Sequence, residues 1–265
     1  MKMKYIAIFA ACFGLMLSTS HSANGQSRVG TTAAPFLTLG TGAKGQSLGS
    51  AYTTMAVGAD AVFWNPAGAA RGYSGSNSGS AFFTHHEWLA DINYNAAAVV
   101  VPVMGSAVIG LGIAAVDYGD MVVRTVAQPE GTGETFSSTD LSLGLTYAQP
   151  LTTQFYFGGT VKYVRQQIRD MSATGVAFDL GFVLETRYLN GLQLAASIQN
   201  FGTKLEMRGV NGQTFVDIDP SNSGNNDNIP ARLEMDSWDL PLYFKFGASL
   251  PVFDVNNVQL RVLAD

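Results

Sequence analysis

One stretch indicates the fold class most clearly. It reads Val176-Ala177-Phe178-Asp179-Leu180-Gly181-Phe182-Val183-Leu184-Glu185. Large apolar residues occupy every second position, and most of the residues between them are small or charged. Successive side chains of a β-strand point to opposite faces, whereas a helix would need apolar residues three and four positions apart. The stretch therefore predicts a strand with one apolar face and one small or charged face.

The same alternation recurs along the chain from about Gly79. Further apolar sets at alternate positions are Leu141, Leu143, Leu145 and Tyr147; Phe155, Phe157, Val161 and Tyr163; Leu192, Leu194, Ala196 and Ile198; Leu242, Phe244, Phe246, Ala248 and Leu250; and Val258, Leu260 and Val262. These runs predict about nine strands, near residues 78–87, 91–102, 105–118, 137–149, 153–169, 173–187, 191–201, 239–250 and 256–264. Many of them reach the roughly 9–11 residues that a tilted strand needs to cross a bilayer.

The composition indicates which kind of β protein this is. Charged residues make up only 13% of the chain, and Gly is abundant at 29 residues. A soluble all-β domain is the alternative, but its solvent-facing surface would need more charged residues than the chain supplies. We therefore predict an all-β fold, an antiparallel transmembrane β-barrel with large apolar residues facing lipid and small or charged residues lining the lumen. The lumen-facing charges in this prediction are Lys162, Asp179, Glu185, Lys245 and Arg261.

The N-terminus has the features of an export signal. Lys2 and Lys4 precede an apolar run from Tyr5 to Leu17, and small residues follow up to Gly25. This order predicts a secretory signal peptide over residues 1–25. The single cysteine, Cys12, lies inside it, so an exported chain would have neither a disulfide framework nor a cysteine metal site. The net charge of -5 argues against nucleic acid as a partner.

The connections between the predicted strands differ on the two sides. Those after the second, fourth, sixth and eighth strands are short, and Pro102, Pro150 and Pro251 are expected to end strands because proline cannot donate to a β-ladder. The long connections, Gly119–Phe136 and Gly202–Trp238, lie on the other side and predict extracellular surface loops. The first strand then runs outward, so we expect the preceding segment to begin on the periplasmic side. An odd strand count predicts that further strands follow Asp265.

Residues 26–76 precede the predicted barrel, and between Gly30 and Arg71 they do not alternate and are rich in Gly and Ala. This predicts short helices and tight turns, packed as a plug inside the barrel of residues 77–265. Within the plug, Ala51 to Ala61 followed by Trp64-Asn65-Pro66-Ala67-Gly68 resembles the N-terminal hatch of FadL-like outer-membrane proteins. Gly30–Leu37, which reads GTTAAPFL, resembles more closely the opening of the PorV/PorQ branch.

The resemblance covers about forty residues well, together with the general barrel pattern. It implies a barrel of about 14 strands when complete, plugged by this hatch. The residues Asn65, Pro66 and Ala67 form its hatch motif. Pro66 disfavours helix at Asn65, and the Asn65 amide can pair with backbone groups inside the plug. The motif is either a rigid turn or an element that gates transport.

No motif for catalysis is present. The sequence has no nucleophile elbow, no zinc-protease motif and no phosphate loop, so we predict neither an enzyme nor a cofactor or metal site. His85-His86-Glu87 is the only histidine cluster, and adjacent residues of a strand point to opposite faces. Together with Trp88 it is more typical of the aromatic belt at a membrane interface. Asp217, Asp219 and Asp227 lack the spacing of a calcium loop.

Two functions follow from the resemblance. PorV-like proteins act in type IX secretion, where they receive cargo through its C-terminal signal domain and deliver it for surface attachment. The implied partners are outer-membrane lipids, secreted cargo proteins and other secretion components. FadL-like barrels instead take up hydrophobic small molecules, which makes a hydrophobic ligand the alternative partner. A mainly structural barrel with no carried substrate is the third possibility. Under each of the three, we expect the protein to lie in the outer membrane of a Gram-negative bacterium.

Overall fold

The computed structural model describes residues 31–73, 78–103, 105–218, 221, 228–255 and 258–265. The predicted signal peptide, residues 1–25, lies outside these residues. The described part of the chain is mostly antiparallel β, as the alternation predicts. None of its helices is long and apolar enough to cross a membrane.

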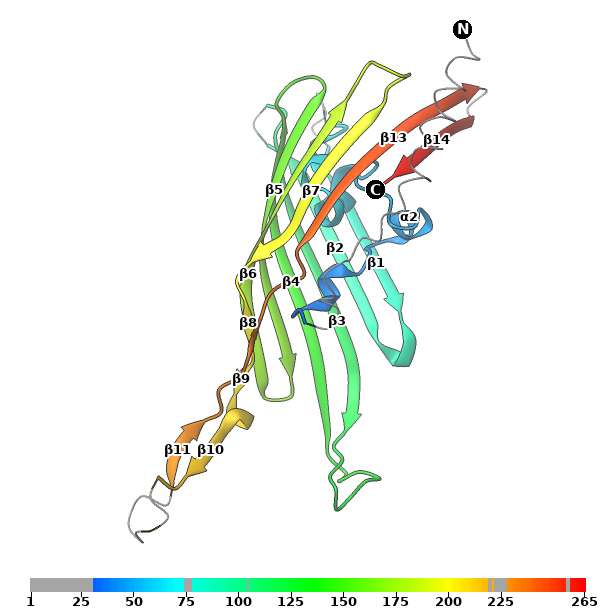
Figure 1. The fold of residues 1–265 in the computed structure, drawn as a ribbon. Coiled ribbons are helices and arrows are strands. Elements are labelled where there is room, and N and C mark those ends of the chain that lie inside the picture. The colour runs from blue at the N-terminus through cyan, green and yellow to red at the C-terminus, as the bar shows by residue number, and fades with distance from the viewer. Residues whose placement is uncertain (1–30, 74–77, 104, 219–220, 222–227, 256–257) are drawn as a thin grey trace, which may run out of the picture. The chain divides into compact units, whose positions relative to one another are not determined.

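One large antiparallel sheet dominates the structure (Figure 1). Its strands lie in the order β1 (Ser80–Glu87), β2 (Asn93–Pro102), β3 (Val108–Val122), β4 (Thr135–Pro150), β5 (Phe155–Ile168), β6 (Met171–Glu185), β7 (Gln193–Gly202), β13 (Tyr243–Val255) and β14 (Val258–Ala264). All nine predicted strands are therefore confirmed, with ends that shift by a few residues. Among the described residues β1 and β14 form the two ends of the sheet order, and no pairing between them closes it.

The two faces of the sheet separate the residue types as predicted. On β6, Phe178 is 47% exposed and Asp179 only 1%. The same contrast holds on β4, where Leu145 is 54% exposed and Thr146 is fully buried. We call the face with the exposed apolar side chains the outer face and the opposite one the inner face. An apolar outer face of this extent needs a cover of lipid or protein.

One proline prediction is wrong. Pro102 and Pro150 end β2 and β4, but Pro251 lies inside β13, which continues to Val255. The pairing of β13 with β14 shifts register between Pro251 and Phe253. A bulge leaves one residue out of the regular ladder, so the missing N–H of Pro251 is tolerated there without ending the strand.

The long connection after β7 carries strand pairs of its own. β8 (Leu205–Glu206) pairs with β12 (Ser237–Trp238), and β9 (Arg208–Gly209) pairs with the start of β6. A hairpin follows, formed by β10 (Gln213–Val216) and β11 (Ile229–Arg232), with the short helix η5 (Val210–Gly212) before it. The strands thus extend the sheet on its long-connection side (Figure 1). Another short helix, η4 (Leu89–Asp91), joins β1 to β2.

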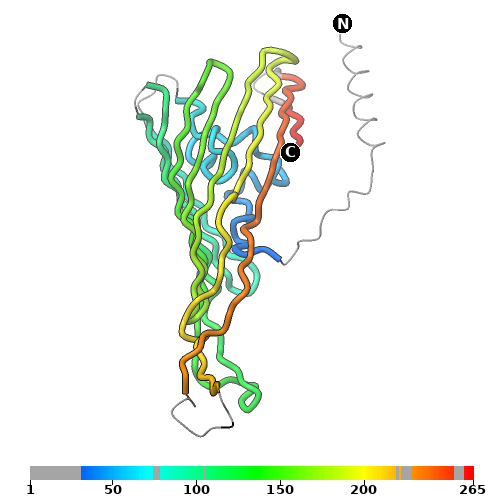
Figure 2. Tube along the Cα trace, turned by 60° about the vertical axis from the view of Figure 1, so that its left-hand side comes forward, coloured from blue at the N-terminus to red at the C-terminus, as the bar shows by residue number. Residues whose placement is uncertain are grey.

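The segment before the sheet forms short helices and turns, as predicted. It contains η1 (Pro35–Thr38), α2 (Ala43–Ser47), η2 (Gly58–Asp60), α3 (Ala61–Trp64) and η3 (Pro66–Ala70). We call Thr32–Tyr73 the N-terminal segment. It packs against the inner face, with η3 touching β3 to β6 and η2 touching β1 and β2. Figure 2 shows the sheet curling around it.

The N-terminal segment does not begin where we expected. Thr32 forms a parallel bridge with Asp239, and the Ala33 N–H donates to the Asp239 carbonyl at 2.9 Å. Asp239 follows β12 and precedes β13, on the long-connection side of the sheet. The segment then runs along the inner face to Tyr73, beside Ser80 at the short-turn side. The expected start on the short-turn side is therefore wrong for the described residues, because the segment spans the inner face lengthwise.

Candidate functional site: the seat of the N-terminal segment

The motif Asn65-Pro66-Ala67 lies at the centre of the contact between the N-terminal segment and the sheet. Asn65 and Ala67 are fully buried. The backbone of Asn65 is extended, with φ -156° and ψ 106°, which fits the restriction that a following proline imposes. Asn65 thus ends α3 and begins η3, and the predicted turn at this position is confirmed.

The Asn65 side chain uses its amide in three hydrogen bonds. Its Nδ2 donates to the backbone carbonyls of Thr53 and Phe182, each at 3.2 Å. Its Oδ1 accepts from the backbone N–H of Ala67, also at 3.2 Å. The amide therefore joins two turns of the segment to β6. Burying any of these groups without a partner would cost about 1–3 kcal/mol each.

Two glycines on the sheet make room for this motif. Gly158 on β5 and Gly181 on β6 are direct cross-strand partners. A Cβ at Gly181 would overlap Asn65 Oδ1, and a Cβ at Gly158 would come within 2.6 Å of the Ala67 backbone nitrogen. We call these two glycines with Asn65, Pro66 and Ala67 the seat. The lack of side chains at the glycine pair lets backbone pack on backbone.

Trp64, which precedes the motif, is held on several sides. It is only 2% exposed, and its indole Nε1 donates to the Thr41 carbonyl at 2.9 Å. Tyr52 packs edge-on against it with ring centroids 5.5 Å apart. The Gln199 amide on β7 donates to the Trp64 carbonyl at 2.8 Å and to that of Phe63 at 3.2 Å. The end of α3 is therefore fixed to β7 as well as to β5 and β6.

Tyr52 carries a hydrogen bond within the segment. Its phenol donates to Asp60 Oδ2 at 2.8 Å, and the ring is 6% exposed. Burial, together with the hydrogen bond and the charge of Asp60, raises the pKa of the Tyr52 phenol well above its ordinary range. The phenol thus stays protonated and keeps Asp60 paired over the whole physiological pH range.

Four of the five charges predicted for the inner face take part in two ion pairs and two cation–π contacts. Lys162 Nζ and Asp179 Oδ2 are 2.6 Å apart, and the Asp179 side chain has no exposed surface. Asn200, in a left-handed conformation with φ 62°, donates its N–H to Asp179 Oδ1 at 2.8 Å and accepts from Lys162 Nζ at 2.9 Å. This group lies where the register of β6 and β7 shifts.

Glu185 pairs with a residue that the sequence analysis did not select. Arg71, 7% exposed at the end of η3, donates from Nε to Glu185 Oε1 at 2.9 Å and places Nη2 at 2.7 Å from the same oxygen. Its Nη1 donates to the Thr54 carbonyl. The pair fastens the last turn of the N-terminal segment to the end of β6. Arg71 is the one arginine within the segment, and this isolated charge was the signal available in the sequence.

Lys245 and Arg261 are placed differently. Lys245 Nζ lies 4.8 Å from the centroid of the Trp64 ring and 5.9 Å from that of Tyr243. Arg261 is half-buried on β14 opposite Pro251. Pro251 is six positions along β13 from Lys245, about 20 Å at the rise of a strand, so Arg261 does not join the other four charges.

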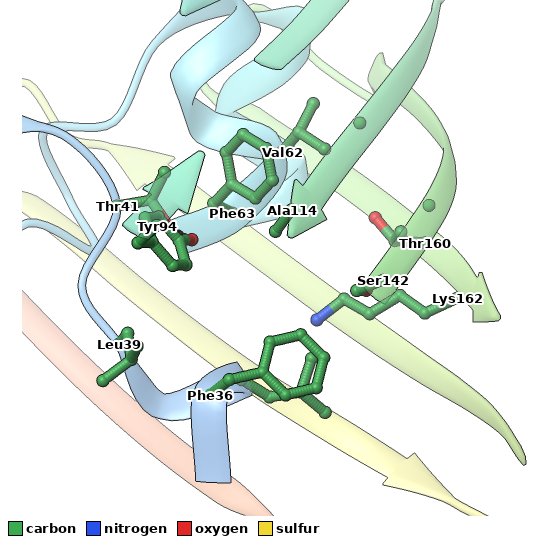
Figure 3. A pocket seen from close by; sticks show the side chains of 13 residues that line it. Phe36, Leu39, Thr41, Val62, Phe63, Tyr94, Ala114, Ser142, Thr160 and Lys162 are labelled. Atoms are coloured by element: carbon green, nitrogen blue, oxygen red, sulfur yellow. Dashed lines mark hydrogen bonds between the residues drawn. The ribbon is translucent and has the colours of Figure 1, made fainter. Parts of the chain in front are cut away.

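A narrow pocket lies between the segment and β2 to β5 (Figure 3). Phe36, Phe63 and Tyr94 line it, and the Lys162 ammonium points into it. Its volume is about 40 Å³, which holds one or two water molecules. The Thr41 hydroxyl and the Tyr94 phenol share a hydrogen bond of 2.7 Å at its edge.

The histidine pair lies away from this site. His85 Nδ1 is 2.8 Å from Asn95 Oδ1, whereas the His86 ring lies 5.8 Å from Tyr94. These partners are on opposite faces of β2, so the two histidines point in opposite directions as predicted. In the described part of the chain, no three His, Cys, Asp or Glu residues gather closely enough to hold a metal.

No protein-family model matches the chain, and no curated protein matches it either. A function is therefore inferred from the seat and from the charges around it. They have the properties of a structural contact, because the buried Asn65 amide and the four charged groups of the two ion pairs all have partners.

Proposed function

We propose that the protein is an outer-membrane β-barrel of the PorV/PorQ type that acts in protein secretion and in the surface attachment of secreted cargo. In this proposal the outer face contacts lipid, since its large apolar side chains are exposed along every long strand. The sheet forms the barrel wall, and the N-terminal segment is the hatch inside it. The resemblance in Gly30–Leu37 and Asn65-Pro66-Ala67 supports this family.

The observation that carries the proposal is on the long connection between β7 and β13. Val210 is 59%, Phe215 68%, Ile218 69% and Leu233 53% exposed. In the proposed barrel this connection lies beyond the lipid, where exposed apolar side chains have no lipid cover. Such side chains are typical of surfaces that bind proteins. Cargo or another secretion component is the partner that this proposal assigns to them.

The inner face supports an adaptor rather than an open pore. The seat and the ion pairs fix the N-terminal segment against β5, β6 and β7, and the pocket beside Lys162 holds only one or two waters. A protein that presents its loops to partners needs no passage through its interior. The proposal therefore gives the hatch a permanent structural role.

The alternative is a FadL-like transporter of hydrophobic small molecules, and one pocket favours it. Pro35, Phe36 and Leu39 of the segment, with Trp88, Leu89, Ile92, Val116 and Tyr118 of the sheet side, line a mostly apolar pocket of about 300 Å³. This volume is at the lower end of the ~300–1,000 Å³ typical of ligand pockets. Transport from it would need the N-terminal segment to move.

A deletion strain tests the two functions. Loss of secretion and surface attachment of proteins that carry the C-terminal signal is expected, with rescue by the wild-type gene. Rescue by the double variant Phe215→Ser/Ile218→Ser should fail, whereas Val126→Ser, a fully exposed residue on the β3–β4 connection, should rescue. Intact secretion combined with impaired growth on fatty acids would contradict the proposal and support the transporter.

A further inference from the structure

Lys245 is a half-buried cation of the inner face, and among the described residues it forms no ion pair. Lys162 and Arg71 have Asp179 and Glu185 within 3 Å, but among the described residues no carboxylate lies within ion-pair distance of Lys245. The charge of Asp265 acts on the Lys245 ammonium from beyond ion-pair distance, and Asp265 Oδ2 accepts the Thr53 N–H at 2.8 Å. Taking an ammonium partly out of water without a close counter-ion is costly, and a ring contact offsets only part of that cost.

The Lys245 side chain lines a pocket rather than the packed seat. This pocket has a volume of about 230 Å³ and is bounded by Lys245 and Tyr243 on β13, Gln199 on β7, and Phe63 and Trp64 on α3. Leu37 and Leu39 add apolar surface, and Thr38, Thr41 and Ser50 add neutral polar groups. Lys245 is the only charged residue among those that line it. The pocket therefore combines one cation with apolar, aromatic and neutral polar surface.

The protein's own contacts hold the aromatic wall of the pocket. Trp64 is fixed by its hydrogen bond to Thr41, by Tyr52 and by Gln199. Because these contacts hold the ring in one orientation, the Lys245 ammonium above it is positioned rather than free. Little ordering would be needed on binding, which favours affinity.

The geometry points to a binding site for a compact organic carboxylate in this pocket. The carboxylate pairs with the Lys245 ammonium, and the apolar body of the ligand lies against Phe63, Leu37 and Leu39. A water molecule takes about 30 Å³ of liquid, so the pocket volume of about 230 Å³ is equivalent to roughly eight waters. This is the size of a short or single-ring acid and is below the room that a long acyl chain needs. The site goes beyond the proposed secretion role and does not depend on it.

Fluorescence of Trp64 in the full chain, reconstituted in lipid nanodiscs, tests this inference. The chain has three tryptophans, so Trp88→Phe and Trp238→Phe leave Trp64 as the single reporter. Titration with benzoate should give a saturable change in emission. Lys245→Met should weaken the apparent affinity at least tenfold, Lys245→Arg should retain it, and Lys204→Met on the exposed long connection should leave it unchanged.

Two further ligands test whether binding depends on the carboxylate and on the size of the ligand. Benzyl alcohol has the shape of benzoate without its charge, and it should bind at least tenfold more weakly. Palmitate carries the same carboxylate on a long chain, and it should show no tighter Lys245-dependent binding than benzoate. Circular dichroism and the thermal midpoint check that each variant is folded.

The inference fails if benzoate gives no saturable change, if folded Lys245→Met binds it as well as the parent chain, or if benzyl alcohol binds equally. Tighter Lys245-dependent binding of palmitate than of benzoate would contradict the proposal that the ligand is compact. Secretion measured in the deletion strain is a separate readout, so failure of the pocket and failure of the proposed function are distinguishable.

Discussion

Gly158 and Gly181 face each other across β5 and β6, and Asn65-Pro66-Ala67 occupies the space that their side chains would otherwise fill. Substituting Gly181→Ala should therefore push Asn65 out of its place and destabilise the protein by about 1–3 kcal/mol, the usual cost of overpacking. Thermal unfolding of the reconstituted protein measures this loss.

Gly159→Ala is the matched control, because Gly159 is next in sequence to Gly158 but lies on the other face. A Cβ there would make ordinary contacts of 3.5 Å with Leu180 Cδ2 and 3.6 Å with the Asp179 carbonyl. Its unfolding midpoint should stay close to that of the wild type. Equal loss in Gly159→Ala and Gly181→Ala would show that the seat is not what requires Gly181.

The Asn65 amide gives a second prediction. Asn65→Asp keeps the acceptor for the Ala67 N–H but brings a carboxylate against the carbonyls of Thr53 and Phe182. We expect it to destabilise the segment at least as much as Asn65→Ala, since burying an uncompensated charge costs more than losing a hydrogen bond. Limited proteolysis within residues 32–73 should become faster in both variants. A protease rate for Asn65→Asp equal to that of the wild type would contradict the role of the Nδ2 donor.

The pair of Lys162 and Asp179 gives a third prediction. Because the Asp179 side chain has no exposed surface, Lys162→Met leaves a buried carboxylate without its counter-ion, at a cost of about 3–5 kcal/mol. Replacing both residues, as Lys162→Met/Asp179→Leu, should recover part of this loss. A double-mutant cycle from urea unfolding gives the coupling energy. Additive effects of the two substitutions would mean that the pair contributes no coupling.

Alkaline pH should reduce the contribution of Tyr52 to the free energy of unfolding. In the folded chain the pKa of its phenol is raised above the value near 10 that it has when unfolded, chiefly by burial and also by Asp60. The folded state then retains a proton that the unfolded state releases, so its stabilisation is complete below pH 10 and declines as the pH rises further. Tyr52→Phe should show a smaller decline above pH 10 than the wild type. Parallel pH curves for the two proteins would argue against this.

The strands could be predicted because the alternation that identifies each strand lies within a short stretch of the sequence. A period of two places each side chain on a face regardless of what lies across the sheet, so Phe178 and Asp179 were assigned correctly from their neighbours alone. Pro251 was assigned wrongly because a bulge depends on the partner strand. The residue type of Pro251 and its position in the sequence do not show where the pairing with β14 shifts register.

The site was predicted only in part, for a related reason. The turn at Asn65 follows from Pro66, and the shared face of Lys162 and Asp179 follows from alternation. Which glycine meets Asn65, or that Glu185 pairs with Arg71, depends on contacts between residues more than a hundred positions apart. Sequence spacing does not predict contacts between residues so far apart in the chain, so only the structure identifies these partners.

The N-terminal segment has a consequence for assembly. It is synthesised first, yet Ala34 is held by Gln166, Asn65 by Phe182 and Thr53 by Asp265, at sequence separations of 132, 117 and 212 residues. Contacts this distant carry a large loop-closure entropy and form slowly. The segment must therefore wait, with its apolar side chains uncovered, until β5, β6 and β14 have paired. The segment is therefore the first part of the described chain to be synthesised and among the last to reach its final contacts.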